Sequence, residues 1–176
     1  MDTIKVSVVD TSGKFDLTEW ATCLVRLDEI EVSSVDDIVE KVSRRCIARE
    51  AMLERLDIFA HGKGGIFRIG DDWIGSVHAP GDDPLITFGG LQTFFSDDGI
   101  IVLCVCEAGQ NDATLLKFSR IVGVPVYATT GDVSPNMSFS NFGWWWGPTV
   151  AAFPDGTFAR GMSVRIPVDP WEGPQS

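Results

Sequence analysis

The stretch Gly99–Gly109 constrains the fold most strongly, because it places an unbroken run of apolar and cysteine residues, Ile100 to Val105, between two glycines. Such a run predicts a strand that is buried on both faces, as strands of parallel sheets are. A parallel strand delivers its last residues to the carboxyl edge of the sheet, where ligands of open α/β folds bind. In this chain the residue at that edge is Cys106.

A second strand of the same kind is predicted over Leu56–Ala60, and it leads directly into His61 and Gly62. The imidazole of His61 and the thiol of Cys106 are 45 positions apart in the chain. If the two strands are neighbours in one parallel sheet, both side chains lie at the same edge.

The remaining segments alternate between strand and helix patterns, which predicts an α/β fold with a mostly parallel sheet flanked by helices. The glycine-rich segment 62–65 is expected to be irregular, and 96–99 is expected to be a turn. The other predicted elements are a strand over 4–9, a helix over 17–27, a helix over 35–46 that could extend towards 55, a hairpin over 66–77, a weak helix over 86–95, a helix over 112–122, a strand over 124–129 and a hairpin over 149–160.

The last third of the chain differs in composition. A tryptophan-rich loop is expected over 134–147, ahead of the C-terminal hairpin, and the proline-rich stretch 167–176 is expected to be a flexible tail. The length of 176 residues suits one domain, to which we assign residues 1–166.

The formal net charge of −11 argues against a nucleic-acid-binding protein and against docking on anionic lipid. No apolar run approaches the ~20 residues that span a bilayer, and no signal-peptide pattern opens the chain. We interpret the four cysteines as reduced thiols, which favours a cytoplasmic protein or one exported without a classical signal peptide.

A thiol and an imidazole at one sheet edge can form a catalytic dyad. In that interpretation Cys106 is the nucleophile, His61 moves the proton, and the amides of Gly62 and Cys106 stabilise the oxyanion. Glycine at position 62 would let a substrate carbonyl approach the backbone. The competing interpretation is structural, since a cysteine in a strand is often a small buried hydrophobe and His-Gly after a strand is often a turn.

Two alternatives concern the same thiols. Cys104 lies on the same face of the strand as Cys106, but only Cys106 is at the strand end, which favours Cys106 as the nucleophile. A zinc site made of Cys104, Cys106, His61 and His78 is less favoured, because Cys-x-Cys in a buried strand lacks the usual knuckle spacing.

The chain resembles the caspase-like (clan CD) cysteine hydrolases, and most closely the bacterial caspase-like and toxin protease domains. Three motifs carry the resemblance: Ile58-Phe-Ala-His-Gly62, Val102-Leu-Cys-Val-Cys-Glu-Ala-Gly109 and Val126-Tyr-Ala-Thr-Thr130. In caspases the histidine precedes the cysteine by about 50 residues. The resemblance covers roughly residues 4–131, and it implies a three-layer sandwich and a cysteine endopeptidase without a cofactor.

The resemblance also suggests how a protein or peptide substrate, including one with a basic side chain, would bind. Asp132 is the best-placed carboxylate for a basic side chain, with Asp71 and Asp72 behind it. Trp144 and Trp145 could form a wall of the substrate cleft.

The chain departs from the caspase pattern at the nucleophile. The signature Q-A-C-x-G is absent, and Glu107 directly follows Cys106, where a nearby carboxylate would disfavour a thiolate. Two further hypotheses therefore stay open: a catalytically inactive caspase-like module that binds a protein, and an effector or toxin hydrolase that acts on a non-peptide substrate.

Overall fold

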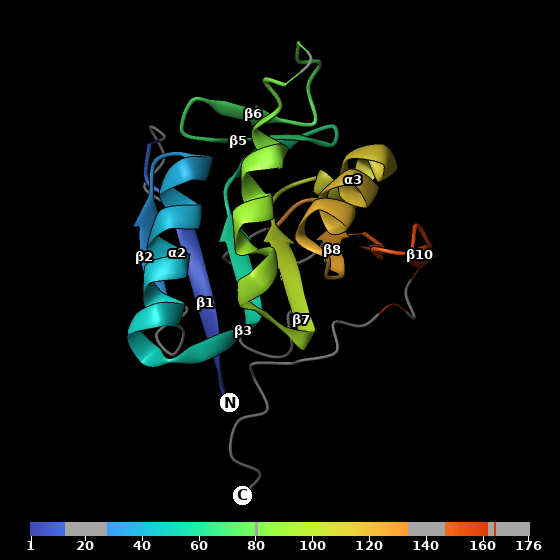
Figure 1. Ribbon diagram of the computed structural model, residues 1–176. Helices are drawn as coiled ribbons and strands as arrows, with labels where there is room; N and C mark the ends of the chain where they lie inside the picture. Colours follow the sequence, from blue (N-terminus) through green and yellow to red (C-terminus); the bar gives the residue numbers. More distant parts are fainter. Residues whose placement is uncertain (13–27, 80, 134–146, 162–163, 165–176) are drawn as a thin grey trace, which may run out of the picture.

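A seven-stranded sheet forms the centre of the protein in the computed structural model (Figure 1). The structure describes residues 1–12, 28–79, 81–133, 147–161 and 164. The strands lie side by side in the order β10-β9-β8-β7-β3-β1-β2. Their bounds are Asp2–Asp10 (β1), Asp28–Val32 (β2), Ala51–Phe59 (β3), Phe95–Cys104 (β7), Val126–Thr129 (β8), Thr149–Ala152 (β9) and Phe158–Gly161 (β10).

Most of this sheet is parallel, which confirms the fold class predicted from the sequence. Strands β2, β1, β3, β7 and β8 run in one direction. Strand β9 is antiparallel to β8, and β10 is antiparallel to β9, so the predicted C-terminal hairpin is also confirmed. The two strands that lead into His61 and Cys106, β3 and β7, are neighbours in the middle of the sheet.

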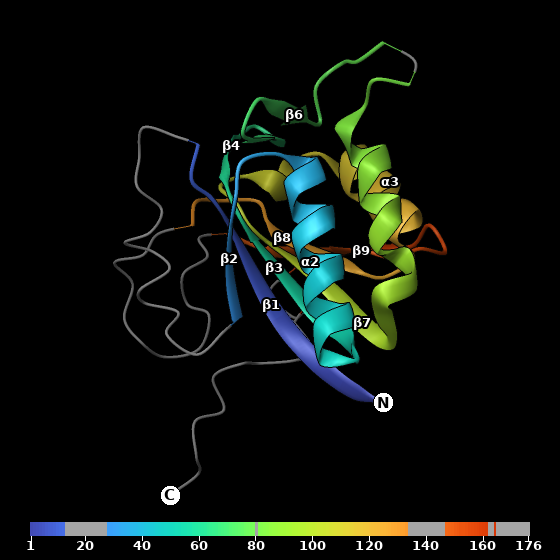
Figure 2. The same ribbon diagram turned by 60° about the vertical axis from the view of Figure 1, so that its left-hand side comes forward.

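Three helical elements cover one face of the sheet (Figure 2). They are α2 (Val35–Arg49), the 3₁₀ helix η2 (Pro84–Phe94) and α3 (Asp112–Val122). Each presents an apolar stripe to the sheet, as amphipathic helices do. The buried stripe residues are Val35, Ile38, Val42 and Cys46 of α2, Leu85, Phe88 and Leu91 of η2, and Leu115, Phe118 and Val122 of α3.

The opposite face of the sheet is buried as well. Its apolar cluster consists of Val9, Phe59, Ile100, Val102, Cys104, Tyr127 and Ala151. Because Leu56 and Ile58 face the helices, the alternation along β3 turns Arg55 and Asp57 to this second face. Burial of both faces is compatible with a three-layer sandwich.

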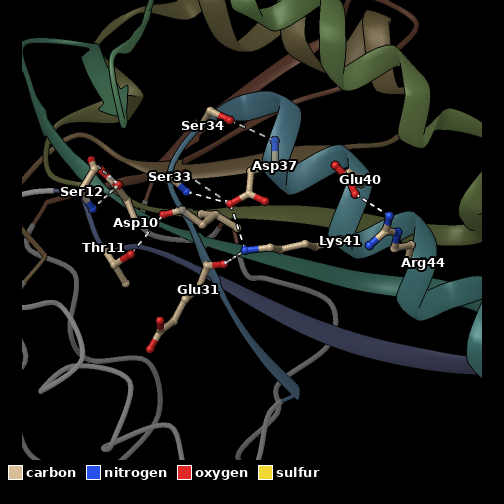
Figure 3. A network of polar contacts seen from close by, with 11 residues as sticks. Asp10, Thr11, Ser12, Glu31, Ser33, Ser34, Asp37, Glu40, Lys41 and Arg44 are labelled. Atoms are coloured by element: carbon tan, nitrogen blue, oxygen red, sulfur yellow. Dashed lines mark hydrogen bonds and ion pairs between the residues drawn. The ribbon is translucent and has the colours of Figure 1, made fainter.

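Helix α2 begins where its sequence predicts. The Ser34 Oγ accepts a hydrogen bond from the Asp37 N–H at 3.1 Å, and the Asp37 carboxylate accepts one from the Ser33 N–H at 3.1 Å (Figure 3). These bonds satisfy N–H groups at the helix start. The Lys41 Nζ lies 3.0 Å from the Asp37 carboxylate and 2.8 Å from Glu31 O, so it joins α2 to β2.

Other boundaries differ from the sequence-based prediction. The helix predicted over 35–46 extends to Arg49, but not as far as 55, because β3 begins at Ala51. The turn expected over 96–99 is a bulge within β7, since the pairing jumps from Leu53–Phe95 to Arg55–Ile100. Strand β2 was not expected at all, and the helix expected over 17–27 lies outside the described residues.

A small three-stranded sheet stands over the carboxyl edge of the large one (Figure 1). It consists of β4 (His61–Lys63), β5 (Ile66–Ile69) and β6 (Asp72–Ile74), so β5 and β6 form the predicted hairpin. The irregular structure expected over 62–65 is wrong in its first half. Gly62 and Lys63 belong to β4, where they pair with Phe67 and Ile66.

Of the tryptophan-rich loop expected over 134–147, residues 134–146 lie outside the described residues, as does the tail expected over 167–176. Among the helices that the structure describes, none combines the length and apolar character needed to cross a membrane.

We expect Glu50→Gly to raise the free energy of unfolding by about 1 kcal/mol, because non-glycine residues are disfavoured in the left-handed conformation. Glu50 ends α2 with φ 50° and ψ 38°, and its N–H caps the carbonyls of Cys46 and Ile47. Urea denaturation measures the change. Glu50→Ala keeps the disfavoured conformation and serves as the control. A glycine variant no more stable than the alanine variant would contradict the prediction.

Candidate functional site

The structure brings His61 and Cys106 to the same edge of the large sheet. The parallel register of β3 and β7 ends with Phe59 opposite Cys104. His61 and Cys106 each follow two residues later in their chain segments, so they leave the sheet at the same level. The two residues expected from the sequence to form a dyad are therefore neighbours in the topology.

Gly62 shows how closely the two segments approach. A Cβ atom added to Gly62 would lie 2.4 Å from Val105 Cγ1 and 2.9 Å from Cys106 O. Such contacts are too short for any side chain, so only glycine allows the start of β4 to lie against the end of β7. The sequence suggested glycine here for substrate approach, and the structure adds this packing reason.

Cys106 is half-buried and contacts the loop that follows β8. Its Sγ accepts a hydrogen bond from the Val133 N–H at 3.3 Å and lies 3.6 Å from Val133 O, to which the thiol can donate. Both contacts involve backbone atoms, so they fix the sulfur without depending on a particular side chain at position 133.

Cys104 is in a different environment, although it is only two residues away. Its side chain is buried, and burial raises the pKa of the Cys104 thiol well above its ordinary value. The Asp57 carboxylate raises this pKa further, while the Arg55 guanidinium opposes the rise. Cys104 therefore stays a neutral thiol near pH 7, which favours Cys106 as the nucleophile.

His61 is exposed and begins β4, where it pairs with Arg68 of β5. The sequence placed His61 after the end of a strand, and the structure places it also at the start of the next one. The small sheet thus carries both His61 and Gly62, and its position relative to β7 determines the geometry between the imidazole and the thiol.

Glu107 has a structural role that the sequence did not suggest. Its carboxylate accepts a hydrogen bond from the Gly64 N–H at 2.6 Å, and its backbone is left-handed, with φ 58°. The only local signal for this role is that a glutamate, and not a glycine, occupies the sharp turn at the end of the strand. The contact itself links positions 43 residues apart, which no local pattern reveals.

The other residues predicted to bind substrate differ in their surroundings, and only some of them are exposed. Asp132 is exposed in the loop after β8, next to Gly131, whose carbonyl accepts the Glu107 N–H at 2.7 Å. Asp71 is exposed in the turn between β5 and β6. Asp72 instead accepts a hydrogen bond from the Val35 N–H at 2.8 Å, so it caps α2. Trp144 and Trp145 lie outside the described residues.

The zinc alternative finds no support in the described ranges, which contain no group of three or more His, Cys, Asp or Glu side chains arranged to hold a metal ion. His78 contacts its own loop, where its Nε2 lies 2.6 Å from Trp73 O and 2.9 Å from Ser76 Oγ. This places the His78 ring in a local hydrogen-bonded turn.

Comparison with known proteins identifies no relative. No protein-family model matches the chain, and neither curated proteins nor solved structures include a significant match. The interpretation of the site therefore depends on its own geometry.

We expect Gly62→Ala to lower the free energy of unfolding by about 1–3 kcal/mol, because the new methyl group would overlap Val105 and Cys106. Urea denaturation measures this effect. The matched control is Gly89→Ala, since a Cβ at Gly89 would meet Ile121 Cγ2 at an ordinary 3.5 Å. Equal stability of the two variants would show that β4 does not lie this close to β7.

We also expect iodoacetamide at neutral pH to modify Cys106 at least about tenfold faster than Cys104 or Cys46 in the folded protein. Burial raises the pKa of the Cys46 and Cys104 thiols, whereas Cys106 is partly exposed. Mass mapping of peptides measures each rate. In urea the difference should vanish. Folded-state labelling of Cys104 as fast as that of Cys106 would refute the expectation.

Proposed function

We propose that the protein is a caspase-like cysteine hydrolase, an endopeptidase that uses Cys106 as the nucleophile and His61 as the general acid and base. The observation that carries the proposal is the shared level of these two residues at the carboxyl edge of β3 and β7. The close approach of Gly62 to Cys106 supports it, because that approach joins the segment of the imidazole to the segment of the thiol.

In the proposed reaction, His61 takes the proton of the Cys106 thiol, and the sulfur attacks the carbonyl carbon of the scissile peptide bond. The carbonyl oxygen becomes an oxyanion, which the Gly62 and Cys106 amides stabilise. When the tetrahedral intermediate collapses, the amine leaves with the proton from His61 and a thioester remains. A water molecule, deprotonated by His61, hydrolyses the thioester and restores the free thiol.

The proposed substrates are proteins or peptides with a basic side chain near the scissile bond. The formal net charge of −11 would attract such substrates. Asp132 is an exposed carboxylate in the loop that contacts Cys106 through Val133, which supports a role in binding a basic side chain. A three-layer caspase-like sandwich belongs to the same proposal, supported by the two buried faces of the sheet.

The second candidate function is an inactive caspase-like module that binds a protein partner. The contact between Cys106 Sγ and the Val133 backbone favours it, because a thiol held by two backbone groups can be a structural element. The two candidates differ in one measurable property, the dependence of Cys106 reactivity on His61.

We expect a peptidyl acyloxymethyl ketone to label Cys106, and the rate to fall about 10²-fold or more in His61→Ala, the usual contribution of a general base. Mass mapping locates the label, and the inactivation rate constant gives the size of the effect. Cys106→Ser should abolish labelling, while Cys104→Ser is the matched control and should keep the wild-type rate. A labelling rate that does not change in His61→Ala would contradict the hydrolase proposal and would favour the inactive binding module.

A further inference from the structure

We infer that Glu107 is a positioning residue, whose carboxylate holds the turn between β4 and β5, and with it His61 and Gly62, against the nucleophile Cys106. This inference rests on the proposed hydrolase function and extends it. The sequence suggested that the negative charge of Glu107 would disfavour a thiolate at Cys106. The inference instead gives Glu107 a role that supports the site, because its carboxylate holds the site together.

The first observation is the bond between the Glu107 Oε2 and the Gly64 N–H, at 2.6 Å. A carboxylate that accepts from a backbone N–H forms a charge-assisted hydrogen bond, which is stronger than a neutral one. Gly64 follows His61 by three positions, in the turn that closes β4 onto β5. The bond therefore acts directly on the segment that carries the imidazole.

The turn needs such an external contact, because its own residues restrain it weakly. Gly64 and Gly65 both have positive φ, at 61° and 77°, and glycine has the largest backbone freedom of any residue. Among the described residues, a Cβ at Gly64 would meet nothing within 4 Å, so that side of the turn is open. On the other side, Gly65 lies against Asn111 at the start of α3, where a Cβ would lie 2.5 Å from Asn111 Cβ.

The backbone of Glu107 is fixed from a third direction. Its N–H donates to Gly131 O at 2.7 Å, in the loop whose Val133 contacts the Cys106 sulfur. One residue thus connects the end of β7, the β4–β5 turn and the loop after β8. The left-handed conformation of Glu107, φ 58° and ψ 11°, accompanies both bonds.

Glu50 provides an internal comparison for that conformation. It is the other non-glycine residue with positive φ in the described part of the chain, and it precedes β3 at the sheet end opposite the site. No hydrogen bond or ion pair of its side chain is present among the described residues. Variants at Glu50 therefore separate the effect of the backbone conformation from the effect of the carboxylate.

The experiment compares Glu107→Gln, Glu107→Ala and Glu107→Gly with Glu50→Ala and Glu50→Gly. One readout is amide hydrogen exchange at Gly64 by NMR, which reports the hydrogen bond between Glu107 and Gly64 without requiring catalysis. The other is inactivation by the peptidyl acyloxymethyl ketone, resolved into the inactivation rate constant kinact and the inhibitor constant KI. Glutamine keeps an acceptor oxygen, while alanine and glycine remove it.

We expect Gly64 exchange to rise and kinact to fall, each about tenfold, in Glu107→Ala and Glu107→Gly, with KI little changed. Glu107→Gln should restore most of kinact, which a purely structural role would not require. In both Glu50 variants, Cys106 should be labelled with the wild-type kinact. Wild-type Gly64 exchange or wild-type kinact in Glu107→Ala would overturn the inference.

The glycine variant makes the test sharper. If the left-handed backbone alone mattered, Glu107→Gly would label like the wild type, and that result would also overturn the inference. Failure of the hydrolase proposal is recognised separately, because then wild-type labelling itself does not depend on His61. Labelling that depends on His61 but not on Glu107 refutes the positioning role alone.

Discussion

The parallel pairing of β3 with β7 is the contact on which the core and the proposed site both depend. Its register aligns two long and largely buried strands, so their side chains alternate between the helix-covered face and the opposite face. The same register fixes where both strands end. Because His61 and Cys106 each lie two residues beyond those ends, a slip of one strand by one residue would move the imidazole relative to the thiol and would also exchange the buried faces.

The buried pair Arg55–Asp57 gives the second face of the sheet a polar centre. Burial raises the pKa of Asp57, and the Arg55 guanidinium, 2.7 Å away, opposes that rise. Buried ion pairs stabilise weakly as a whole, but the loss of one partner is costly because a charge is left buried. The pair also acts on the neighbouring Cys104 thiol, whose pKa is raised by burial and further by the Asp57 carboxylate, while the Arg55 guanidinium opposes the rise.

The sequence predicts the strands with continuous apolar runs and the helices with capping residues, because both signals are local. It does not predict β2, whose acidic residues Asp28, Glu29 and Glu31 outnumber the buried Ile30 and Val32 of an edge strand. The strand-end rule suffices to predict that His61 and Cys106 follow neighbouring parallel strands at the same edge of the sheet. The contact of Glu107 with Gly64 cannot be predicted in this way, since it depends on where the small sheet folds over the edge of the large one.

Glu107 is a place where local preference and tertiary structure disagree. At a sharp strand exit with φ 58°, glycine would be the locally favoured residue, and non-glycine residues are disfavoured there by about 1–2 kcal/mol. The same conflict at Glu50 has no side-chain bond to offset it among the described residues, whereas at Glu107 a carboxylate bond to Gly64 does. Strain of this kind persists where surrounding contacts fix the conformation, and it is frequent at functional sites. Because Glu50 has the same conformation far from the proposed site, it is the carboxylate bond of Glu107, directly after the thiol at the sheet edge, that supports the proposed site independently of the resemblance to caspases.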